Sequence, residues 1–323
     1  MTSRIAWLTL LLVLAAPTAS ARRVAAGPAW DREVGRRLEH RPTRSERRRF
    51  ALGATVDGPI ARQKVLDQIK SLAARRAETG VTVSFLMPER SACPVVRVDL
   101  PAARPGAVRA LINAGTHGEE VRQSVPQALA FLEHAARDKG YRSRFQTTVL
   151  IKLGPDGPEQ AALPAEERRL TRGKDMNRTF AAGRWIPESR AIRRSLAGQA
   201  FDVFVDLHAD SALDGFVLVN ESLGANASRW SVLGRALSAM PSVSLVDARP
   251  DRPVNADYTL HRLGAGRTPS SFVGCLDTYL ARRGVPYSFT IETPQRLSVE
   301  QQRRGGVRLL RSILENVRVH GAR

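Results

Sequence analysis

Residues 108–134 read VRALINAGTHGEEVRQSVPQALAFLEH, and the rest of the chain is organised around this stretch. The apolar run Val108–Gly115 predicts a strand that ends in a turn, and Val121–His134 predicts a helix. His117 and Glu120 therefore lie where a strand ends and a helix begins. Their spacing allows one short loop to offer an imidazole nitrogen and a carboxylate oxygen to a single metal ion.

A His-x-x-Glu pattern is short, so its meaning depends on the rest of the chain. On its own it also fits an ordinary solvated turn between a strand and a helix. A catalytic zinc ion typically takes three protein ligands and leaves one position open. Asp206-Leu207-His208 ends another apolar run, and His208 is a candidate for the third ligand.

Apolar runs of strand length alternate with helical patterns along the chain. The predicted strands are 82–86, 95–100, 108–115, 147–153, 201–207, 216–220, 242–246 and 287–291. Leu52–Ile60 predicts a further strand, a turn at Gly58-Pro59 and a strand start, while Gln63–Ala77 and Val299–Val317 have helical spacing. This alternation predicts an α/β fold with a single domain, in which helices cover both faces of a mixed, mostly parallel twisted sheet.

Three of the candidate residues occupy equivalent places in the predicted sheet. His117, His208 and Glu292 each lie at or just beyond the end of a strand. Ligands of open α/β sheets bind outside the carboxyl ends of the strands. We therefore expect these three side chains to converge on one site.

The N-terminus predicts export. Arg4 precedes the apolar run Ile5–Ala16, and Ala19-Ser20-Ala21 has the small-x-small pattern of a cleavage site, so residues 1–21 predict a signal peptide. The apolar run is too short to span a membrane, which takes about 20 residues, and no later stretch is long enough. We expect a secreted or periplasmic protein with a leader segment at residues 22–48 and one folded domain at residues 49–323.

Charge and cysteine content set further limits. The net charge of +19 favours anionic partners such as an anionic cell-envelope polymer. The arginines are scattered, aromatic residues make up 6% of the chain, and no nucleic-acid-binding module is present, so we expect no nucleic-acid partner. Cys93 and Cys275 are the only cysteines. An exported protein permits a disulfide between them, and two buried thiols fit equally well.

Two further motifs carry polar groups suited to a catalytic site. In Lys174–Arg178, the Arg178 guanidinium can bind a carboxylate with two parallel hydrogen bonds, and the Asn177 amide adds a donor. Asp175 can accept the second N–H of a metal-bound His117. Glu292 ends the last predicted strand, where a carboxylate beside activated water can accept and return a proton. A plain polar loop and an ordinary strand-end acid are the alternatives.

The motifs resemble, in order and approximate spacing, the zinc metallocarboxypeptidases of the carboxypeptidase A type, which are related to the succinylglutamate desuccinylase and aspartoacylase group. The resemblance covers the chain from Leu52 to the C-terminus and rests on four stretches. These are His117-Gly118-Glu119-Glu120, Asp175-Met176-Asn177-Arg178, Asp206-Leu207-His208 and Thr290-Ile291-Glu292-Thr293-Pro294. It implies a carboxypeptidase-like catalytic domain at residues 49–323.

The resemblance implies one zinc ion per chain, bound by His117, Glu120 and His208. It also implies that Glu292 is the general base and acid. By the same resemblance, Asn177 and Arg178 grip the terminal carboxylate of a peptide substrate.

The family also uses an upstream arginine to polarise the scissile carbonyl. Arg168 is our candidate, with Arg169 and Arg172 as alternatives. The stretch Thr268–Phe272, where digestive members carry a mobile tyrosine, contains none here. The residue that lines the specificity pocket falls at Leu276 or Asp277, which favour apolar or basic C-terminal residues respectively.

The predicted function is zinc-dependent hydrolysis of an amide bond next to a free C-terminal carboxylate. One alternative is a zinc-dependent deacylase of N-acyl amino acids. The arginine-rich loop at residues 168–172 would suit a substrate with an acidic acyl group. Another alternative is a zinc- or cell-wall-binding module without catalysis.

Overall fold

The computed structural model describes most of the chain between Pro59 and His320, and all described residues belong to one compact unit, Arg44–Arg323. The described residues are 59–87, 94–117, 120–153, 176–180, 185–210, 216–220, 243–247, 275–295 and 297–320. The predicted signal peptide and leader segment, residues 1–48, lie outside this set, so both stay predictions. Among the described helices, none combines the length and apolar character needed to cross a membrane.

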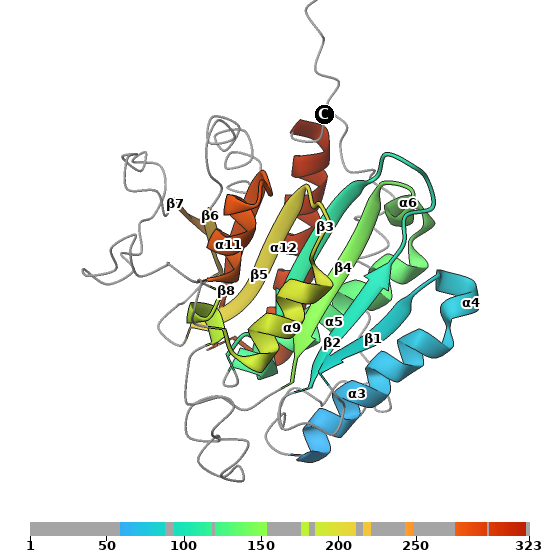
Figure 1. Cartoon of the computed structure of the whole chain (residues 1–323), viewed down its shortest axis with the longest axis horizontal. Coiled ribbons are helices and arrows are strands. Elements are labelled where there is room, and N and C mark those ends of the chain that lie inside the picture. The colour runs from blue at the N-terminus through green and yellow to red at the C-terminus, as the bar shows by residue number, and fades with distance from the viewer. Residues whose placement is uncertain are drawn as a thin grey trace, which may run out of the picture. The chain divides into compact units, whose positions relative to one another are not determined.

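In the described part of the chain, eight strands form one sheet in the order β1-β2-β4-β3-β5-β8-β6-β7 (Figure 1). Their bounds are β1 Thr82–Met87, β2 Val95–Leu100, β3 Val108–Ala114, β4 Phe145–Lys152, β5 Val203–Asp210, β6 Phe216–Asn220, β7 Val243–Asp247 and β8 Tyr287–Pro294. Four of the seven strand pairs are parallel, namely β3–β4, β3–β5, β5–β8 and β6–β7. The predicted mixed, mostly parallel sheet is confirmed.

Helices cover both faces of this sheet, as expected. The described helices are α3 Pro59–Ala74, α4 Arg76–Thr79, α5 Val121–Arg137, α6 Lys139–Arg142, α9 Pro187–Ser195, α11 Leu276–Arg282 and α12 Val299–His320, with a 3-10 turn, η3, at Met176–Arg178. Figure 1 shows α9 and α11 in front of the strands and α5 and α12 behind them. The sheet is therefore the middle of three layers.

The prediction of a turn at Gly58-Pro59 followed by a strand start is wrong, because helix α3 begins at Pro59. Proline suits the first turn of a helix, since its missing N–H would have no partner inside the helix anyway. The Gly58-Pro59 pair thus marks the start of a helix. The strand expected from Leu52 up to that turn lies outside the described residues.

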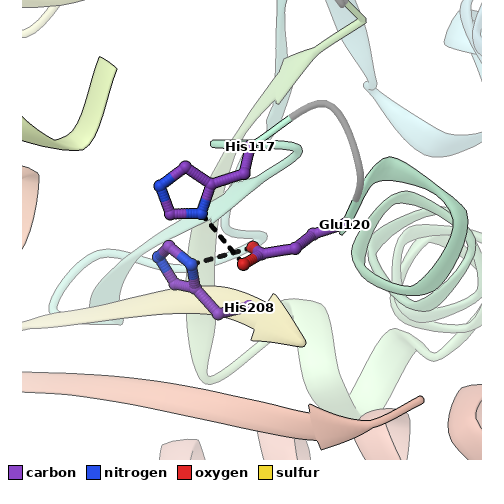
Figure 2. A group of neighbouring side chains, drawn as sticks. All are labelled: His117, Glu120 and His208. Atoms are coloured by element: carbon purple, nitrogen blue, oxygen red, sulfur yellow. Dashed lines mark hydrogen bonds and ion pairs between the residues drawn. The ribbon is translucent and has the colours of Figure 1, made fainter. Parts of the chain in front are cut away.

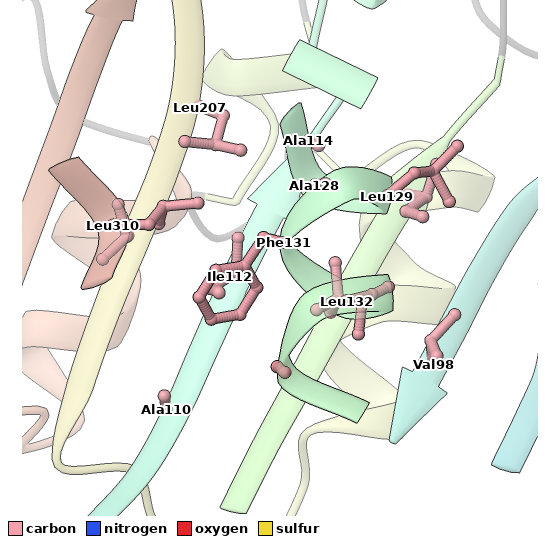
Figure 3. Packing of buried hydrophobic residues seen from close by; sticks show 14 of the residues in the cluster. Val98, Ala110, Ile112, Ala114, Ala128, Leu129, Phe131, Leu132, Leu207 and Leu310 are labelled. Atoms are coloured by element: carbon pink, nitrogen blue, oxygen red, sulfur yellow. The ribbon is translucent and has the colours of Figure 1, made fainter. Parts of the chain in front are cut away.

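One hydrophobic cluster fills the space between the sheet and helices α5 and α12. Buried residues of α5 lie three and four positions apart: Ala128 is followed by Phe131 and Leu132, and Leu129 is followed by Leu132. Figure 3 shows these side chains turned toward Ile112 on β3 and its neighbours. This amphipathic spacing is why the sequence after the His-x-x-Glu motif forms a helix that lies against the sheet.

A second hydrophobic cluster lies on the other face, under α9 and α11. Ile192 on α9 and Leu280 on α11 pack there with Leu111 and Phe204 from the two central strands. Strands β3 and β5 are therefore buried on both faces, which explains their nearly continuous apolar sequences.

Candidate metal centre

The loop between β3 and α5 is shaped by a glycine and a buried serine. Gly115 has a φ of 78°, and a Cβ atom at this position would collide with the backbone oxygen of Lys152. The backbone N–H of Gly115 donates to Oγ of Ser124 at 3.0 Å, and this hydroxyl donates to the Glu120 carbonyl at 2.8 Å. The serine of α5 thus links the end of the strand to the start of the helix.

This loop places His117 and Glu120 side by side. The backbone N–H of Glu120, the N-cap residue of α5, donates to the His117 carbonyl at 3.1 Å. Nδ1 of His117 lies 2.9 Å from Oε1 of Glu120. A carboxylate at the N-terminus of a helix is also stabilised by the helix dipole.

His208 reaches the same point from β5 (Figure 2). Its Nδ1 lies 2.9 Å from Oε2 of Glu120, and its ring centroid is 5.0 Å from that of His117. One ligand atom from each of His117, Glu120 and His208 lies within 4.8 Å of the others. The structure therefore brings together the three residues that the sequence analysis chose as metal ligands.

The charges of this cluster depend strongly on one another. Burial opposes ionisation of Glu120, yet the neighbouring His208 and His117 lower its pKa to about 2 from the usual 4.5. Burial likewise works against a charged His208, but Asp206 and Glu120 on its two sides raise its pKa well above 6.5. In the metal-free protein a proton on His208 therefore offsets part of the negative charge.

The donor set fits a zinc ion. Oε2 of Glu120 is buried and has no hydrogen bond of ordinary geometry among the described residues, so a cation next to it would satisfy this oxygen. Two imidazole nitrogens and one carboxylate oxygen are a ligand set found in catalytic zinc sites. Among the described residues, His117, Glu120 and His208 form a group of potential metal ligands.

Strand register brings Glu292 to the same end of the sheet. Glu292 on β8 pairs directly with His208 on the parallel strand β5. Residues paired in register point to the same face of the sheet. Glu292 is partly exposed and lies within β8, which continues to Pro294, instead of ending the strand.

The loop residues proposed to bind substrate are only partly described. Asn177 lies in η3, is buried, and accepts a hydrogen bond on Oδ1 from the backbone N–H of Leu276 at 3.3 Å. Only the backbone of Arg178 is described. Arg168 and Asp175 lie outside the described residues, so their roles stay predictions.

The two specificity candidates at the start of α11 are both buried. Leu276 belongs to the second hydrophobic cluster, and Asp277 is 2% exposed. Cys275 precedes them and is buried too. Cys93 lies outside the described residues.

Asp206 is a site residue to which the sequence analysis gave no role. Its Oδ2 lies 3.1 Å from Nε2 of His208, and its side chain is fully buried. The Asp-x-His spacing is a signal that could have found it. Alternate residues of a strand point to the same face, so the two side chains had to be neighbours.

Comparison with solved structures supports the assignment of the fold. A metallo-carboxypeptidase from Burkholderia cenocepacia matches with a TM-score of 0.57 at 17% identity, over 79% of this chain and 68% of that one. A metallo-carboxypeptidase from Pseudomonas aeruginosa, solved in complex with (2-guanidinoethylmercapto)succinic acid, matches with a TM-score of 0.55 at 14% identity, over 80% and 68%. Thrombin activatable fibrinolysis inhibitor matches with a TM-score of 0.54 at 13% identity, over 80% and 74%.

The chain therefore has the fold of the metallo-carboxypeptidases. No protein-family model matches it, and no curated protein is significantly similar in sequence. At such low identity the likeness in structure concerns the fold.

Proposed function

We propose that the protein is an exported zinc-dependent metallocarboxypeptidase that hydrolyses an amide bond next to a free C-terminal carboxylate. The observation that carries this proposal is the cluster of His117, Glu120 and His208 at the carboxyl ends of β3 and β5. This edge of the sheet is where open α/β folds bind their ligands.

The chain supplies a base next to this cluster. A bound zinc ion would provide a Lewis acid that polarises a carbonyl and lowers the pKa of water towards about 7. Glu292, opposite His208 in the sheet, accepts the proton of the attacking water and passes it to the leaving amine. Its partial exposure allows contact with substrate and solvent.

Substrate binding is assigned to the polar loop that precedes α9. Asn177 and Arg178 bind the terminal carboxylate, which restricts cleavage to the end of a chain. The hydrogen bond from Leu276 to Asn177 holds this turn against the start of α11. Arg168, or its neighbour Arg169 or Arg172, stabilises the negative charge that develops on the carbonyl oxygen.

Export and the cell-envelope partner complete the proposal. The N-terminal residues 1–21 have the pattern of a signal peptide. A net charge of +19 suits a protein that works on or near an anionic envelope polymer. Binding to that polymer should weaken as salt is added, because exposed charges are screened.

The first test measures zinc content and hydrolysis by the purified chain without residues 1–21. We expect about one zinc ion per chain and cleavage of blocked dipeptides with a free C-terminus. Glu292→Gln should keep the metal and lose roughly 100- to 10,000-fold in turnover, the usual share of general acid–base catalysis. Glu133→Gln is the matched control, because this residue of α5 lies roughly 20 Å along the helix from Glu120. Its turnover should equal that of the wild type.

The substrates separate the proposal from its alternatives. Equal cleavage of C-terminally amidated and free peptides would contradict a carboxypeptidase. Preference for N-acetyl or N-succinyl amino acids would identify a deacylase. Bound zinc without turnover of peptides or N-acyl amino acids would indicate a binding module. Absence of zinc binding would contradict the proposed metal centre.

A further inference from the structure

Asp206 is a charged residue in the middle of the sheet. It is 0% exposed on β5, between β3 and β8. Burying a carboxylate is costly unless other groups compensate for the lost hydration. The contacts of its two oxygens therefore indicate what this charge does.

The first oxygen of Asp206 is held by two neutral donors. Nδ2 of Asn113, the residue paired with Asp206 on strand β3, donates to Oδ1 at 2.7 Å. Oγ1 of Thr116 donates to the same oxygen at 3.3 Å. These two contacts fix the direction of the carboxylate.

The second oxygen of Asp206 is directed at His208. Oδ2 lies 3.1 Å from Nε2, within reach of a proton on that nitrogen. The other ring nitrogen, Nδ1, faces Glu120 at 2.9 Å. The imidazole of His208 therefore lies between two carboxylates. Glu120 is a candidate metal ligand, and Asp206 is not.

We propose that Asp206 is a positioning residue that orients His208 for metal binding, and that Asn113 couples this histidine to His117. Asp206 holds the proton of His208 at Nε2, which leaves the lone pair of Nδ1 directed at the ion. This inference rests on the proposed metal centre.

Asn113 connects the two histidines through a single amide. Its Nδ2 also donates to Oγ1 of Thr116 at 2.6 Å, and Thr116 immediately precedes His117. Nζ of Lys152, buried on β4, donates to the Thr116 carbonyl at 2.9 Å. The network thus reaches from β4 through the loop to β5, and it sets the separation of the two imidazoles.

The test measures the dissociation constant of zinc by competition with a chromophoric chelator, and the visible spectrum of the cobalt-substituted protein. Asp206→Asn should weaken zinc binding roughly 10- to 100-fold, as is typical when the hydrogen-bond partner of a metal-bound histidine is removed. It should also change the cobalt spectrum, which reports ligand geometry. Asp99→Asn, which removes a carboxylate of β2 that binds Arg97, should leave both unchanged.

A double variant separates positioning from a purely structural role. Asn113→Asp with Asp206→Asn keeps one carboxylate and one amide in the pair but moves the charge from β5 to β3. We expect it to fold with the stability of the wild type in metal-free form, yet to bind zinc as weakly as Asp206→Asn. Recovery of zinc affinity in the double variant would overturn the proposal, as would an unchanged affinity and spectrum in Asp206→Asn.

A milder variant covers the case in which Asp206→Asn does not fold. Thr116→Val keeps Asp206 and removes one donor to it, so we expect zinc binding to weaken roughly two- to tenfold, less than for loss of the carboxylate. An unchanged affinity in that folded variant would contradict the network. A wild-type protein that binds zinc without cleaving peptides would contradict the proposed function but not the role of Asp206. The affinity measurements that test this role do not depend on turnover.

Discussion

His208 has a buried carboxylate on each side, and its protonation is therefore linked to metal binding. Asp206 and Glu120 raise its pKa well above 6.5 in the metal-free protein, although burial works in the opposite direction. A metal ligand must be a neutral imidazole, so zinc has to displace the proton. The same pair of acids that attracts a cation thus also attracts a competing proton.

We predict that zinc affinity increases with pH through the neutral range. Below the raised pKa of His208, each zinc ion displaces one proton, so the dissociation constant should fall by up to about tenfold per pH unit. The chelator competition assay at pH 6, 7 and 8 measures this directly. A dissociation constant that does not change over this range would show that His208 is already neutral.

At the scale of elements, α12 approaches the sheet and α5 closely because it carries two adjacent glycines. A Cβ atom on Gly305 would collide with the ring of Phe216, and one on Gly306 would collide with the side chain of Gln127. Gln127 is fully buried on α5 and donates to Oγ1 of Thr293 at 2.9 Å, next to Glu292 on β8. The glycines thus allow the helix that begins directly after Glu120 to be tied to the strand that carries Glu292.

Gly306→Ala should destabilise the protein although alanine favours helices. The added methyl group displaces Gln127 and breaks its hydrogen bond to Thr293, and overpacking of this kind costs about 1–3 kcal/mol. Urea unfolding of the metal-free protein measures the change. Arg308→Ala, at an exposed position of the same helix, should change the free energy of unfolding by less than about 0.5 kcal/mol. Equal effects of the two variants would contradict close packing at Gly306.

At the scale of the whole molecule, the candidate ligands join distant parts of the chain. His117 and Glu120 lie between β3 and α5, whereas His208 lies on β5. The unfolded chain does not hold these residues together, so an ion that binds all three stabilises the folded state. Zinc should therefore act as a link across the centre of the sheet.

We predict that zinc raises the melting temperature of the metal-free protein. Saturation at 100 to 1,000 times the dissociation constant contributes about 2.7–4.1 kcal/mol, which corresponds to roughly 5–15 °C for a domain of this size. Calorimetry with and without zinc measures the shift, and EDTA should reverse it. His208→Ala should abolish most of the shift, and a full shift in that variant would place the metal elsewhere.

The local features of the fold followed from the sequence. Each strand of the sheet was predicted within a few residues, because alternating or continuous apolar runs are a property of neighbouring residues. The helices α9 and α11 were not predicted, since they are nine and seven residues long and their periodicity is too short to recognise. The order of the strands also had to come from the structure, because pairing depends on contacts between distant segments.

Part of the candidate site could likewise be predicted from the sequence, and part of it required the structure. The sequence alone identified His117, Glu120, His208 and Glu292 as chemically suitable residues, from the spacing of short motifs. Only the tertiary structure brought the two histidines within reach of one carboxylate and gave Asp206 its place between Asn113 and His208. The physical reason is that residue type and spacing set which groups can act, whereas the register of β3, β5 and β8 sets which groups meet.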